Sequence, residues 1–143
     1  MASAYQKFNI FVEDLGKASH NLPSHVYKVL LTNVAPVAAN AVKADITEIA
    51  AGNGYTAGGN VASISSWAQT AGVGKLVLAD PSTWTAAGGS IGPFRYAVFY
   101  NDSQSSPAKP LVGWWDYGSS VLLAAGETFT VDLDQTAGVF TVA

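Results

Sequence analysis

Short apolar segments separated by turn residues run through most of this 143-residue chain. Glycine occurs 14 times and proline 6 times, and from residue 26 onward turn signals recur roughly every eight to twelve residues. These segments do not alternate with long helical patterns, as they would in a chain that forms a parallel sheet. The spacing therefore predicts an all-β, single-domain β-sandwich with a jelly-roll-like strand order.

The expected strands are rich in β-branched and aromatic residues and end at turn residues. They span residues 26–32, 61–67, 75–79, 94–101, 111–117, 121–124, 127–134 and 139–142. Segment 94–101 is apolar on both faces, so we expect a central strand that is covered on each side. Simple alternation places Phe94, Tyr96 and Val98 on one face of it.

Two local patterns give sharper predictions. In segment 127–134 the apolar residues alternate with polar ones and should face inward. These residues are Phe129, Val131 and Leu133. The dipeptide Asn53-Gly54 predicts a two-residue hairpin turn, because both residues tolerate a positive φ.

The first 22 residues are expected to form an N-terminal arm, and residues 23–143 the sandwich domain. The arm fits two conformations. Phe8 and Ile10 alternate as in a strand, whereas Phe8 and Phe11 have the spacing of one helix face. We favour extended structure because the rest of the chain is β, and a short helix is the alternative.

Charged side chains make up 12% of the chain, against about 25% in an ordinary soluble domain. None lies between Glu48 and Lys75, a stretch of 26 residues. Because surface charge normally prevents association, such a chain is expected to be extracellular or covered by neighbours in an assembly. The net charge of −3 argues against a nucleic-acid partner. The chain also lacks the run of about 20 apolar residues that would span a membrane.

The residues offer little for catalysis. Cysteine is absent, which excludes disulfides and thiolate metal sites and fits assembly in a reducing cytoplasm. His20 and His25 flank Pro23 without an acid at ligand spacing, so we expect partly exposed loop or strand-edge histidines. Asp132 and Asp134 could pair on one strand face, but a solvated face explains them better. We therefore expect no enzyme activity, no metal and no cofactor.

Aromatic residues are the strongest interface candidates. In a strand, Trp115 and Tyr117 share one face and Trp114 takes the other. One tryptophan is then expected in the core, while the other contacts a partner or stacks on a sugar; burial of both between layers is the alternative. Phe8 and Phe11 of the N-terminal arm complete the set of candidates.

Several turn-and-strand motifs resemble those of a known family. They are YKVLLTNVAP at 27–36, ADITEI at 44–49, AGNGYTAGG at 51–59, GSIGPFRY at 89–96, PLVGWWDYG at 110–118 and AGETFTVD at 125–132. Together they resemble small virion proteins of tailed bacteriophages, of the capsid cement or decoration type. The similarity extends from Lys28 to the carboxyl terminus.

The resemblance implies a jelly-roll-like protein on the outer surface of the head, assembled in the host cytoplasm. The implied partners are the major capsid protein and further copies of the chain itself, as a homo-dimer or homo-trimer. The family supplies no catalytic residues. The alternative function is a tail-associated or receptor-binding module that stacks a glycan on exposed aromatic rings. In that case Asp116 and the polar loop of residues 101–110 would supply hydrogen bonds.

Overall fold

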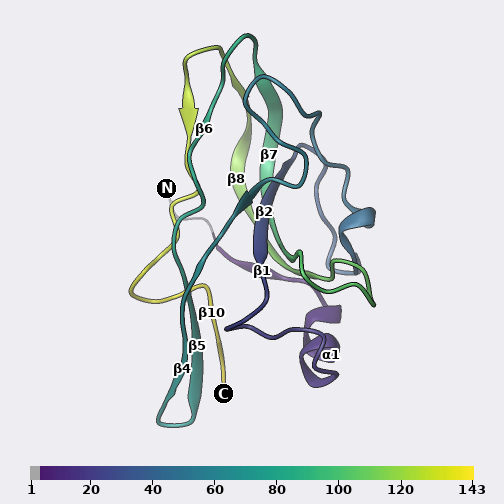
Figure 1. The fold of residues 1–143 in the computed structure, drawn as a ribbon, viewed down its shortest axis with the longest axis vertical. Helices are drawn as coiled ribbons and strands as arrows, with labels where there is room; N and C mark the ends of the chain where they lie inside the picture. Colours follow the sequence, from purple (N-terminus) through teal and green to yellow (C-terminus); the bar gives the residue numbers. More distant parts are fainter. Residues whose placement is uncertain (1–3) are drawn as a thin grey trace.

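The computed structural model describes residues 4–143 and consists mainly of antiparallel strands (Figure 1). The elements are β1 (Gln6–Lys7), α1 (Ile10–Gly16), β2 (Tyr27–Thr32), the 3-10 helix η1 (Lys43–Asp45), β3 (Asn60–Val61), β4 (Ile64–Thr70), β5 (Val73–Leu78), β6 (Trp84–Thr85), β7 (Ile91–Asn101), β8 (Leu111–Leu123), β9 (Thr128–Phe129) and β10 (Phe140–Val142). They form sheets with the orders β1-β8-β7-β2-β3, β10-β5-β4 and β6-β9. The predicted all-β, sandwich-like fold is confirmed.

Strand β7 is the centre of the five-stranded sheet. It pairs with β2 along the whole length of β2, with Tyr27 opposite Asn101, and with β8 on its other side. The apolar segment 94–101 is therefore the central strand that its two apolar faces predicted.

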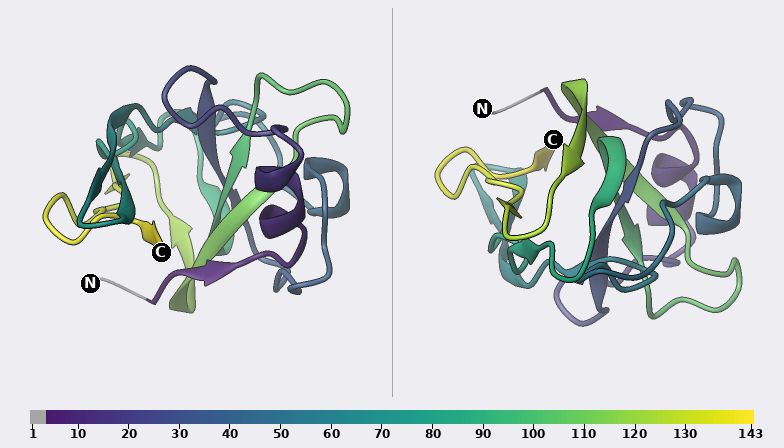
Figure 2. Two further views of the ribbon diagram at one scale, coloured as in Figure 1. Left: turned by 90° about the horizontal axis from the view of Figure 1, so that it is seen from below. Right: turned by 90° about the horizontal axis from the view of Figure 1, so that it is seen from above.

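The main core lies between the five-stranded sheet and the two smaller sheets. Leu31 and Phe99 of the large sheet contribute to it together with Leu76 and Trp84 of the small sheets. Figure 2 shows the small sheets on one side of the large sheet and α1 on the other. A smaller core on the α1 side comprises Phe8, Leu30, Val98, Tyr100 and Leu111.

Residues 4–22 pack as part of the sandwich. Strand β1 pairs with β8, where Gln6 lies opposite Trp114, and α1 follows directly. Phe8 is buried in the smaller core and Phe11 in the main core. The expected extended conformation is wrong for α1. A helical turn is needed there because Phe8 and Phe11 enter different cores and the chain must turn sharply between them.

The pairing of β7 with β8 is irregular near Phe94. The register shifts between Phe94 and Tyr96, which places Phe94 in the main core with Ala97 and Phe99. The predicted common face of Phe94 and Val98 is therefore wrong. A bulge adds residues to one strand and so turns the following side chains to the other face.

Segment 127–134 is only partly a strand. Thr128 and Phe129 pair with β6, and the residues that follow are extended without a strand partner in residues 4–143. Val131 and Leu133 are nevertheless buried, as the alternation predicted. The amide of Leu133 donates to Asp80 Oδ1 at 2.8 Å, so a side chain replaces the missing strand at that point.

Asn53 and Gly54 form the predicted two-residue turn. Gly52 and Tyr55 exchange backbone hydrogen bonds of 2.8 and 3.0 Å across it. The φ angles are 57° at Asn53 and 102° at Gly54, both positive as a type I′ turn requires.

Candidate functional site

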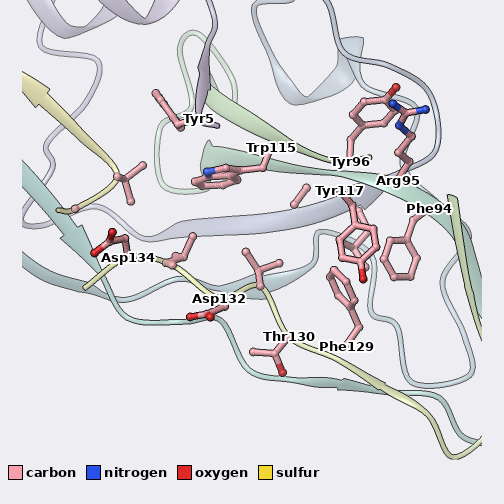
Figure 3. A pocket seen from close by; sticks show the side chains of 16 residues that line it. Tyr5, Phe94, Arg95, Tyr96, Trp115, Tyr117, Phe129, Thr130, Asp132 and Asp134 are labelled. Carbon is pink, nitrogen blue, oxygen red and sulfur yellow. The ribbon is translucent and has the colours of Figure 1, made fainter. Parts of the chain in front are cut away.

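A cavity of about 270 Å³ opens between the five-stranded sheet and the segment 129–139 (Figure 3). Strands β7 and β8 form one wall, and the extended chain after β9 forms the other. We call this cavity the aromatic cleft, after the rings of Tyr5, Phe94, Trp115, Tyr117 and Phe129 that border it.

Strand β8 places two aromatic side chains in the cleft. Trp115 and Tyr117 lie on the same face, because alternate residues of a strand point the same way. Trp115 lies opposite Ala97 of β7, whose small side chain leaves room for the indole. Tyr117 is 42% exposed, so the cleft is open to solvent at its end of the strand.

The rings of the cleft support one another. Tyr5 approaches Trp115 edge to face with 5.6 Å between ring centroids. Phe129 makes similar contacts with Phe94 at 4.8 Å and with Tyr117 at 5.6 Å. The Tyr5 hydroxyl donates to the carbonyl of Val112 at 3.2 Å, and burial raises the pKa of Tyr5. These contacts hold the rings in place, so binding would require little side-chain ordering.

Two carboxylates lie on the wall opposite Trp115. Asp132 and Asp134 are both exposed, as predicted for a solvated face. Asp134 Oδ1 accepts backbone hydrogen bonds from Thr136 at 2.8 Å and Ala137 at 2.7 Å, which lower the pKa of Asp134. Asp134 thus fixes a turn beside the cleft, while Asp132 adds an acceptor to its border.

Asp116 lies on the other face of β8 and is paired with Arg95. The guanidinium donates from Nε to Asp116 Oδ1 at 2.7 Å and from Nη2 to Oδ2 at 2.9 Å. These hydrogen bonds lower the pKa of Asp116. Arg95 is among the residues that border the cleft, whereas Asp116 is not, and Figure 3 shows the Arg95 side chain near Tyr96. Asp116 does not border the cleft, because adjacent strand residues point to opposite faces, so its part in glycan binding stays a prediction.

The polar loop of residues 101–110 is also separate from the cleft. It borders the end of β7 where Asn101 lies, while the cleft borders the other half of that strand. Asn101 is buried and lies beside both histidines. Its Nδ2 is 2.9 Å from His25 Nδ1 and 3.3 Å from His20 Nδ1. His20 is buried, which corrects the expectation of a partly exposed residue.

Within residues 4–143, histidine, aspartate and glutamate side chains do not gather in groups of three that could hold a metal ion. Over the same range, every helix is too short or too polar to cross a bilayer. The arrangement of rings, hydroxyls and carboxylates at the cleft is suited to binding.

The candidate interface residues separate into two groups. Phe8 and Phe11 are core residues of the chain itself and leave no surface for a partner. Trp114 is partly buried against Phe8, with 4.5 Å between the rings. Trp115 and Tyr117 remain accessible in the cleft, so the interface prediction stays open for these two and for the exposed part of Trp114.

Sequence reasoning missed three rings of the cleft. Tyr5 enters through the pairing of β1 with β8, and Phe94 through the register shift in β7. Phe129 was predicted to face inward, and this signal identified its direction but not its neighbours.

Comparisons with models of protein families, with curated proteins and with solved structures gave no match to this chain. The fold and the cleft therefore have to be interpreted from their own chemistry.

Proposed function

We propose that this chain is a non-enzymatic structural protein of a tailed-phage particle, a cement or decoration protein that binds the outer surface of the capsid shell. One observation carries the proposal. The stretch of 26 uncharged residues between Glu48 and Lys75 is largely exposed, and only Tyr55, Gly58 and Ala62 of it are buried. Such a surface favours association, because the charges that keep free proteins apart are missing.

The scaffold is suited to this role. Part of the uncharged surface lies on β4, which pairs with β5, so little ordering of that part is required when a partner covers it. Contacts of modest strength add up when many copies bind a repeating shell. The major capsid protein is the proposed partner, and the family resemblance of the sequence motifs supports the same assignment.

The location of the protein in intact particles tests the proposal. Particles of the phage that encodes the chain should label over the whole head with gold-conjugated antibody against the purified protein. The copy number should be comparable with that of the major capsid protein, because a cement protein follows the shell lattice. Particles from a deletion strain serve as the control for antibody specificity. Label confined to the tail tip, or absent from the particle, would contradict the proposal.

The aromatic cleft favours a second candidate, a glycan-binding module. Stacked rings bind the apolar faces of sugars, and Asp132 provides an acceptor for hydroxyl groups at the border. We expect host polysaccharide to quench tryptophan fluorescence and Trp115→Ala to abolish the quenching. The control is Trp114→Phe, which changes a tryptophan on the opposite face. Unchanged fluorescence of the wild type across the host's polysaccharides would exclude this candidate.

A further inference from the structure

Strand β4 is the longest of the strands at the sheet margins in residues 4–143. The other strands at the margins of the sheets, namely β1, β3, β6, β9 and β10, have only two or three residues. β4 has seven residues, from Ile64 to Thr70, and pairs on one side only, with β5. In Figure 1 it lies at the outer margin of the β4–β5 hairpin, near the lower left.

Natural proteins protect long edge strands with charge, proline or strong bulges, because free backbone groups pair with other chains. The sequence of β4, ISSWAQT, contains neither charge nor proline. Its single register shift lies at the start, between Ile64 and Ser66. By contrast, β1 carries Lys7, and the Phe140 ring of β10 stacks on Tyr5 at 5.8 Å. The part of β8 beyond Trp114 also lacks a second partner among the described residues, but Asp116 and the positive φ of 99° at Gly118 interrupt that edge. β4 is thus a long edge strand without charge, proline or a central irregularity.

The backbone of β4 is ready to pair. Thr70 and Val73 flank the two-residue turn at the hairpin tip and pair with each other. Since hydrogen-bonded pairs alternate along an antiparallel ladder, Gln69 and Trp67 direct their N–H and C=O groups away from β5. The strand is held firmly, because the Trp67 ring packs inward near Phe140 with 6.2 Å between centroids.

We propose that β4 pairs antiparallel with β4 of a second copy of this chain about a twofold axis. The two three-stranded sheets would then form one continuous six-stranded sheet. Charge identifies the second copy as the occupant. Identical charged strands would place like charges opposite each other, whereas the uncharged β4 meets its own copy without repulsion. The serine, threonine and glutamine side chains can form hydrogen bonds across the new pair.

Ser66→Lys tests the pairing. Ser66 is exposed, so the lysine is tolerated in the isolated chain, but two copies of it would lie close together near the twofold axis. In sedimentation equilibrium the wild type should have twice the chain mass of 14.8 kDa, and Ser66→Lys should have the single mass. The matched control is Ser119→Lys, at an exposed position of β8. This variant should remain a dimer. Far-UV circular dichroism checks that all three proteins are folded.

A second pair of variants separates the backbone from the side chain. Gln69→Pro removes an N–H that points away from β5, so it should abolish the dimer while the hairpin stays folded. Gln69→Ala also loses the side-chain hydrogen bond to the Gly72 amide but keeps the backbone N–H, and should stay dimeric. The inference would be overturned by a wild type that is trimeric, or monomeric at every soluble concentration. It would also be overturned if both Ser66→Lys and Gln69→Pro remained dimers. The inference is independent of the proposed function, because a monomer that still labels the phage head would contradict the dimer alone.

Discussion

At the scale of single residues, His20 is one of the few buried polar side chains of the described residues. Its side chain is only 6% exposed, and Nδ1 lies 3.3 Å from both Tyr27 Oη and Asn101 Nδ2. Burial lowers the pKa of His20 to about 4, with a smaller contribution from the nearby His25. The neutral imidazole is therefore the form that the folded chain contains at neutral pH.

This burial makes stability depend on pH. Between the ordinary histidine pKa of about 6.5 and the folded value of about 4, the unfolded chain binds a proton that the folded chain does not. The free energy of unfolding should thus be highest above pH 6.5 and fall as the pH decreases, by up to about 1.4 kcal/mol per pH unit. Urea titrations at a series of pH values measure this slope. In His20→Gln the slope between pH 6.5 and 5 should be shallower, and an unchanged slope would contradict the assignment.

The sequence identified the two histidines but not what surrounds them. His20 and His25 precede β2, whereas Asn101 ends β7, and the pair Tyr27–Asn101 in the register of these strands brings the three together. Strand pairing between distant segments depends on the packing of the whole sheet. Local spacing could therefore not predict that His20 is buried beside Asn101.

At the scale of elements, the alternation of apolar residues predicted which side chains are buried better than it predicted which residues pair in the hydrogen-bonded ladder. Val131 and Leu133 are buried as expected, although they are not part of a strand. Phe94 faces the other way from its prediction because the ladder with β8 slips beside it. Alternation is a property of one segment, whereas register and bulges depend on two, so the second kind of feature was not predictable from local sequence.

The turn at Gly58-Gly59 has a reason beyond chain reversal. Gly59 has a φ of +76°, and a β-carbon on it would lie 1.8 Å from the carbonyl oxygen of Val29. The glycine thus lets the chain approach the backbone of β2 just before β3 pairs with it. The packing of this segment against β2 thus explains why a side chain is excluded at this position.

At the scale of the whole molecule, most of the basic side chains are paired with carboxylates of the chain itself. Five of the seven basic side chains form ion pairs with carboxylates, and Lys75 contacts the carbonyl of Thr136. The five pairs are Lys17–Glu13, Lys28–Asp102, Lys43–Glu48, Arg95–Asp116 and Lys109–Asp102. A partner would therefore meet few free positive charges, and its contact with the uncharged stretch of residues 49–74 would depend on packing and hydrogen bonds.

If the chain binds the phage head through the uncharged stretch, as proposed, this binding should be insensitive to salt. Salt screens exposed charges within about 10 Å at 0.1 M and about 3 Å at 1 M, but hardly affects uncharged contacts. The chain should thus bind heads from a deletion strain with nearly the same affinity across that range, measured by co-sedimentation of labelled protein. Thr56→Lys is the control, since a charge at this exposed position of the uncharged stretch, outside β4, should introduce a salt dependence if that stretch touches the shell. A roughly tenfold loss of wild-type affinity would show that charge holds the protein to the head.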